Sequence, residues 1–249
     1  MIGRSQLASY FIGWDVGGWN CDKNPKNRDA IVILDAHLSL VGKWRGNLRC
    51  PINQVANTGD WIRKLFSLCV VDEPTEAVQV TLAIDTPLGF PQAFLRLATE
   101  MKFVGRVERS DGNPYLFRHT ERYLFEHGLK PLSAIKDMIG SQATKGMHVL
   151  AKFAPTVKTC GVWGDGESLT AIETYPSACK GSKSMAALRG AVASLPSDDG
   201  DDERDALTCA LVAYLFAQRP GQLLGPSGDV ATSEGWIWVP RDILQKTQP

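Results

Sequence analysis

The chain has 249 residues, and 27 Lys and Arg balance 27 Asp and Glu, so its formal net charge is zero. This balance excludes a global field that would pull the protein onto nucleic acid or anionic lipid, although residues 102–158 are locally basic. The length suits one large α/β domain, and we expect a single domain over residues 1–249 that contains an inserted subregion.

Cysteine and histidine usage indicates the cellular setting. The six cysteines form no CxxC pair, and none of the four histidines joins a cysteine at the spacing of a zinc site. We therefore expect a reducing, cytoplasmic environment and no structural zinc. No apolar run reaches the roughly 18 residues that span a bilayer, and the first residues lack the pattern of a secretory signal, so we expect no membrane association.

The first strands are predicted from short apolar runs. Residues 10–14 predict a buried strand, and Asp15 stands at its end. The glycine pair that follows permits a tight turn whose backbone can approach a ligand. Apolar runs at residues 30–34 and 38–44 predict a hairpin that continues an antiparallel meander from the first strand.

The middle of the chain predicts a helix, a strand and an insertion. Apolar residues recur with helical spacing over residues 53–71. Residues 78–84 predict a fourth strand, buried and parallel to the first, with Asp85 at its C-terminal end. Residues 92–158 then form a long stretch with helical patterns near both of its ends, and we interpret it as an inserted helical subregion.

A basic connector within this insertion is a candidate nucleic-acid contact. It carries Arg109, Arg118 and Arg122 together with aromatic residues, a combination that binds phosphates and stacks bases. The alternative is a solvated helical segment whose aromatic residues belong to the core.

The last third of the chain supplies three further acids. Residues 169–174 predict a fifth strand that carries Glu173, and residues 202–218 predict a helix that begins with Asp202 and Asp205. The two aspartates are three positions apart, so they share a helix face. The apolar tail EGWIWVP predicts a docked terminal strand, with a partner interface as the alternative.

Carboxylates in this arrangement are typical of a divalent-metal site. Asp15 and Asp85 become neighbours if their strands pair in parallel, because ligands of open α/β sheets gather beyond the carboxyl ends of the strands. A two-metal site needs several hard oxygen ligands, and Asp and Glu supply them to Mg²⁺ or Mn²⁺.

Each acid also has a structural interpretation. Asp15 suits a turn before two glycines, and Asp85 suits a loop cap. Glu173 can pair with a Lys or Arg of the fold, and Asp202 can cap its helix. Asp205 is favoured in a first helical turn by the macrodipole even without metal.

Six segments together resemble a known family. They are GWDVGGW, LAIDTPLGFP, RSDGNPYLFRHTER, IETYPSACK, DERDALTCALVAYL and EGWIWVP, and they resemble domain-of-unknown-function family 429, predicted nucleases with a ribonuclease H-like fold. The resemblance implies a mixed five-stranded sheet in order 3-2-1-4-5, flanked by helices. It also implies that Asp15, Asp85 and Asp205 match the metal-binding acids of strand one, strand four and the last helix.

Three hypotheses about function follow. The first is a metal-dependent phosphodiesterase acting on DNA or RNA, with Asp15, Asp85 and Asp205 as catalytic metal ligands and with Asp202 and Glu173 as auxiliary residues. The second is a phosphotransferase or ATP-binding protein of the actin and sugar-kinase type, because Asp followed by Gly-Gly also cradles phosphates there. The third is a catalytically inactive binding module with the same fold.

Overall fold

The computed structural model describes residues 7–24, 26–74, 76–107, 109–193, 200–226, 228 and 230–244. Its strands are β1 (Ala8–Asp15), β2 (Asp29–Asp35), β3 (Leu40–Gly46), β4 (Val78–Asp85), β5 (Thr156–Thr159), β6 (Val162–Gly164), β7 (Leu169–Thr174), β8 (Leu223–Leu224) and β9 (Ile237–Pro240). Its α-helices are α1 (Arg49–Gln54), α2 (Thr58–Leu68), α3 (Gln92–Glu100), α4 (His119–Glu126), α5 (Gly140–Phe153), α6 (Pro176–Cys179), α7 (Lys183–Ala191) and α8 (Asp201–Gln218). The expected α/β class is confirmed.

The strands form one mixed sheet in the order β3-β2-β1-β4-β7-β6-β5, and β9 pairs with β7 and β8. β4 lies between β1 and β7 and runs parallel to both. The five strands expected from the sequence are present, but a sheet of only five strands is wrong, because β5, β6, β8 and β9 extend it. These additions have four residues or fewer, which is too short for an alternating pattern to reveal them, apart from β9 in the apolar tail.

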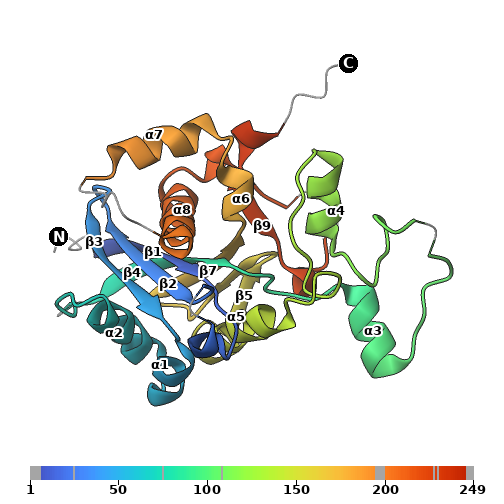
Figure 1. Cartoon of the computed structure of the whole chain (residues 1–249), viewed down its shortest axis with the longest axis horizontal. Coiled ribbons are helices and arrows are strands. Elements are labelled where there is room, and N and C mark those ends of the chain that lie inside the picture. The colour runs from blue at the N-terminus through green and yellow to red at the C-terminus, as the bar shows by residue number, and fades with distance from the viewer. Residues whose placement is uncertain are drawn as a thin grey trace, which may run out of the picture.

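Helices cover both faces of the sheet (Figure 1). α8 and α7 pack on one face, where apolar side chains of α8 meet those of β1 and β2. α1, α2 and α5 pack on the other face around a second apolar cluster. In that cluster the rings of Trp61 and Phe153 stack with centroids 5.1 Å apart, which joins α2 to α5.

The helix expected over residues 53–71 is α2, which is shorter and covers residues 58–68, while residues 53 and 54 end α1. Asn57 separates the two helices in an extended conformation, and its side chain accepts a hydrogen bond from Asp60 N at 2.9 Å to cap α2. The helical pattern was correct, but the capping preference of Asn57 sets the boundary. None of the helices in the described residues is long and apolar enough to cross a bilayer.

The segment between β4 and β5 contains α3, α4 and α5. α5 contributes Val149, Leu150 and Phe153 to the core beneath the sheet. α3 buries none of its residues, and Figure 1 shows it projecting to one side of the sheet. The predicted insertion is thus partly core and partly a lateral extension.

A glycine in β1 sets the distance between α8 and the sheet. A Cβ atom at Gly13 would lie 1.8 Å from Ala206 O and 2.3 Å from Ala210 N. Any larger residue would therefore push the helix away. The close approach brings the first turn of α8 to the end of β1, where Asp15 lies.

Candidate active site

Asp15 and Asp85 lie side by side where two parallel strands end. They are register partners at the last positions of β1 and β4. Within the described ranges, neither carboxylate makes a hydrogen bond or an ion pair. Both line a cleft of about 350 Å³, which we call the acid cleft. The parallel arrangement of β1 and β4, which the sequence predicts, thus places both carboxylates in the lining of one cleft.

The surroundings of this pair disfavour two negative charges. Burial first, and then the charges of Asp85, Asp202 and Asp205, raise the pKa of Asp15 from 3.8 to about 9. Burial, followed by the charges of Asp205 and Glu173, raises the pKa of Asp85 from 3.8 to about 8. At neutral pH the pair therefore retains protons unless a cation takes their place.

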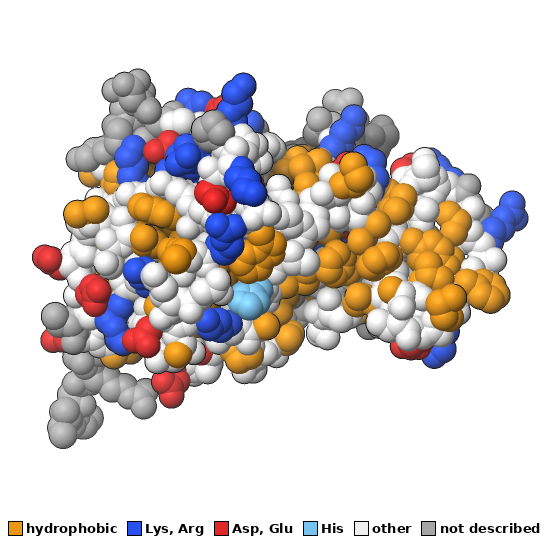
Figure 2. Space-filling view, turned by 60° about the horizontal axis from the view of Figure 1, so that its bottom comes forward, with side chains coloured by type: hydrophobic (Ala, Val, Ile, Leu, Met, Phe, Trp, Pro, Cys, Tyr) orange, Lys and Arg blue, Asp and Glu red, His pale blue; other side chains and the backbone are white. Residues whose placement is uncertain are grey.

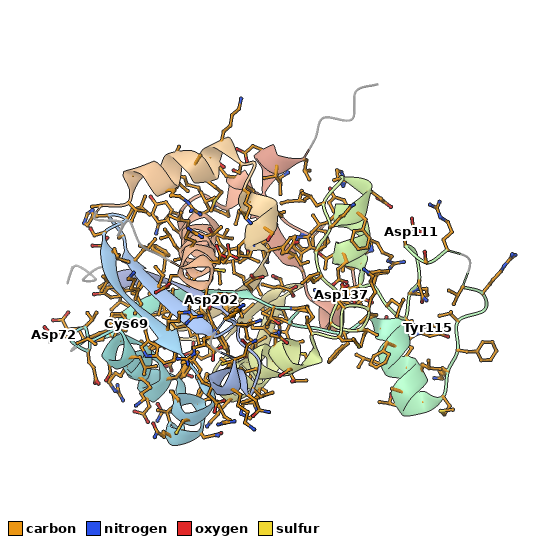
Figure 3. All side chains as sticks on the ribbon, in the orientation of Figure 1. Cys69, Asp72, Asp111, Tyr115, Asp137 and Asp202 are labelled. Atoms are coloured by element: carbon orange, nitrogen blue, oxygen red, sulfur yellow. The ribbon has the colours of Figure 1, made fainter. Side chains whose placement is uncertain are left out.

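Asp202 faces the acid cleft but is already neutralised. Its carboxylate accepts hydrogen bonds from Arg45 Nε at 2.8 Å and from Arg28 N at 3.2 Å. Figure 3 shows Asp202 where α8 meets the sheet, as the sequence predicts. Because its charge is shared with Arg45, Asp202 fits the role of an auxiliary residue better than that of a primary metal ligand.

Asp205 has no direct partner within the described part of the chain, like the two strand acids. Burial raises its pKa, although the positive charge of Lys180 opposes the shift. Asp205 lines a second cavity together with Lys180 and Arg189, whereas Asp202 lines the acid cleft. The two helix acids, which the sequence places on one helix face, therefore line different cavities.

Glu173 is bound by a buried arginine. Arg118 Nη2 and Nη1 donate to its two carboxylate oxygens at 2.6 and 2.8 Å, and Leu88 N donates to Oε2 at 2.8 Å. Arg118 also pairs with Glu121 at 2.7 Å, and its side chain is 1% exposed. Glu173 is therefore not free to act as an auxiliary ligand, contrary to expectation. Arg118 was expected to contact phosphate at the surface, but it is buried and holds two carboxylates of the fold.

The other two candidate arginines lie away from the acid pair. Arg109 is 78% exposed and pairs with Asp111, which Figure 3 places on the loop toward α3. Arg122 lines a separate cavity with Arg96 and Lys102. Neither lines the acid cleft.

Thr86 gives the acid cleft a buried polar atom without a partner. The residue is 5% exposed, and its Oγ1 makes no hydrogen bond. Its methyl group faces α5, because a Cβ at Gly146 would lie 2.6 Å from Thr86 Cγ2. A buried hydroxyl is costly to leave unpaired, so this atom is suited to a bound ligand or water.

Sequence reasoning missed a buried ion pair beneath the turn that follows Asp15. Lys145 Nζ contacts the Asp29 carboxylate and donates to Gly17 O at 3.2 Å, and both charged side chains are fully buried. Asp29 also accepts from Gly17 N and Trp14 Nε1, each at 3.0 Å. The available signal was that Lys145 lies four residues before Val149, on the buried side of α5.

The donor set fits a hard divalent cation held by few protein ligands. No three His, Cys, Asp or Glu side chains among the described residues are grouped so as to hold a metal ion. Asp15 and Asp85 supply two adjacent carboxylates that have no hydrogen-bond or ion-pair partner among the described residues. Mg²⁺ is often bound by one or two carboxylates and several waters, so a pair of this kind suits it.

Comparisons with protein-family models, curated proteins and solved structures found no match. The resemblance to family 429 therefore stays a prediction.

Proposed function

We propose that this protein is a divalent-metal-dependent phosphodiesterase that acts on nucleic acid, with a ribonuclease H-like fold. The proposal rests on Asp15 and Asp85, which lie in register in the lining of the acid cleft and whose carboxylates have no partner among the described residues. Two raised pKa values in one cleft are a feature of functional sites.

The sheet order supports the proposed fold. The five strands located from the sequence are arranged as β3-β2-β1-β4-β7, which corresponds to the order 3-2-1-4-5 that the family resemblance implies. The acids that match the family lie at the ends of β1 and β4 and in the first turns of α8.

The roles of the residues follow from their charge state. Asp15 and Asp85 would hold Mg²⁺ or Mn²⁺, which supplies positive charge to activate a water and to stabilise phosphate oxygens. Asp205 lies close enough to raise the pKa of both acids, so it adds negative potential from the helix side when it is ionised. Arg45 holds Asp202 beside them, and the Arg118–Glu173 pair fixes the loop that follows Asp85 through Leu88 N.

The phosphotransferase hypothesis loses support from the turn after Asp15. A phosphate cradle needs free backbone N–H groups. Here Gly17 N donates to Asp29 at 3.0 Å and Trp19 N donates to Ser141 Oγ at 2.9 Å. Two backbone N–H groups of this turn are thus engaged in internal hydrogen bonds that a phosphate would have to replace.

Calorimetric titration of Mn²⁺ into wild type, Asp15→Asn and Asp201→Asn tests the proposal, together with cleavage of single-stranded, duplex and branched DNA and RNA. Asp201 is a matched control because it lies on α8, is 90% exposed and pairs with Arg204. We expect Mn²⁺ binding and cleavage in wild type and Asp201→Asn, and loss of both in Asp15→Asn. Wild type that binds no Mn²⁺ and cleaves no substrate would favour the inactive binding module.

A further inference from the structure

An apolar cavity adjoins the acid cleft. It has a volume of about 670 Å³, within the range of ligand pockets. Pro131 and Leu132 line both the cavity and the acid cleft, so one wall separates the two spaces. Leu132 is 50% exposed, although it is a large apolar residue. A ligand bound beside Asp15 and Asp85 can therefore extend over this wall.

The lining of the cavity is suited to a flat apolar ring. Leu116, Phe117, Phe125 and Leu129 form much of it, and the rings of Phe117 and Phe125 meet edge to face with centroids 5.0 Å apart. Fixed aromatic and aliphatic surfaces of this kind stack nucleobases without reading their sequence.

The lining also contains polar and charged residues. Ser110 can donate or accept a hydrogen bond at the edge of a base, whereas Asp111 pairs with Arg109 and Asp137 pairs with Lys136. Lys130 also lines the cavity, and its ammonium group has no hydrogen bond or ion pair within the described residues. A free cation beside an apolar slot complements a base attached to a phosphate.

We propose that the apolar cavity is a subsite for one unpaired nucleobase, next to the phosphodiester that lies in the acid cleft. This inference rests on the proposed nuclease function and names its substrate class as single-stranded or unpaired nucleic acid. A base inside a duplex is stacked on both sides, so it enters such a cavity only after unpairing, at a cost in free energy.

The surface around the cavity is consistent with an extended single strand. Figure 2 shows hydrophobic side chains gathered in a band that continues onto the lobe that holds α3. Met101 and Phe103 there are 82% and 79% exposed. Both line a cavity separate from the apolar one, together with Arg96 and Lys102.

Binding to cleavage-deficient protein tests the subsite separately from catalysis. The probes are fluorescein-labelled single strands of thymidine or uridine, about ten nucleotides long to span one site, and a DNA duplex of equal length. The parent is Asp15→Asn, and the second substitution is Leu132→Asp. Met138→Asp is the matched control, because Met138 is an 88% exposed apolar residue six positions away that lines neither space.

We expect the parent to bind single strands in preference to duplex, and Leu132→Asp to weaken single-strand binding by about tenfold while Met138→Asp leaves it unchanged. Equal binding of single strand and duplex, or equal effects of the two substitutions, would overturn the subsite. If wild type cleaves nucleic acid and Leu132→Asp binds like the parent, only the subsite is wrong. If single strands bind as expected but no metal-dependent cleavage is found, the subsite stands and the nuclease function is wrong.

Discussion

Burial and repulsion by nearby acids both raise the pKa values of Asp15 and Asp85. Each is the last residue of a strand, and the two stand at the same height in the sheet. An acid with a raised folded-state pKa keeps its proton in the folded protein and loses it near pH 3.8 in the unfolded chain. The folded state then binds more protons than the unfolded state between about pH 4 and the folded pKa values of about 9 and about 8. Stability therefore falls as pH rises through this window.

The first prediction concerns how the melting temperature of an Asp15 variant depends on pH. In metal-free protein, Asp15→Asn should raise the melting temperature by about 2–4 °C at pH 8, because the amide needs no proton to be buried, whereas wild-type Asp15 gains stability for its unfolded chain by ionising there. At pH 4 the two proteins should melt together. Scanning calorimetry at both pH values with a chelator measures the difference, and a lower melting temperature of the variant at pH 8 would contradict the account.

Arg118 is a residue whose loss should be costly. Two buried carboxylates, Glu121 and Glu173, depend on its guanidinium. We predict that Arg118→Met lowers the free energy of unfolding by about 3–5 kcal/mol, because it leaves buried charges without a partner. Urea denaturation measures the change, with Arg109→Met as the exposed control. A loss below about 1 kcal/mol would show that water or relaxation replaces the arginine.

At the scale of elements, the contact of α8 with β1 places the helix acids beside the strand acids. The contact depends on Gly13, where a Cβ would meet the backbone of Ala206 and Ala210. The strand direction fixes Asp15, and the helix position fixes Asp202 and Asp205. A displaced helix would therefore change the site without any change in its acids.

Substitution of Gly13 tests this contact. We expect Gly13→Ala to lower the free energy of unfolding by about 3 kcal/mol, since the helix must shift to admit a methyl group. Gly190→Ala in α7 is the matched control. A Cβ there meets nothing within 4 Å, so alanine should be neutral or stabilising by up to about 1 kcal/mol. Chemical denaturation compares the two, and equal effects would contradict the contact.

At the scale of the whole molecule, the meander of the first three strands and the parallel pairing of β4 with β1 were predictable from residue patterns, whereas the position of β7 beside β4 was implied only by the family resemblance. Asp15 and Asp85 each follow an apolar run, and this pattern is local. The partners of the acids were not predictable. Glu173 and Arg118 are 55 residues apart, and Asp29 and Lys145 are 116 apart. Charged residues are usually solvated, so the burial of these four appears only when distant segments pack together.

Contacts between distant segments also determine which of the acids have an arginine partner. Asp15, Asp85 and Asp205 lack direct partners in the described residues, whereas Asp202 and Glu173 are each bound by an arginine. The arginines come from β3 and from the end of the connector before α4. The sequence gives no means of assigning them to these acids, because ion-pair partners leave no local pattern.

The central claim is that Asp15 and Asp85 hold a divalent cation together. The most direct measurement is an anomalous difference map from crystals of the wild-type protein grown with Mn²⁺. The account predicts a peak in the acid cleft between the ends of β1 and β4, in coordination contact with both carboxylates, and its absence in Asp85→Asn crystals. A map with no peak at this position, or with a peak that touches neither carboxylate, would contradict it.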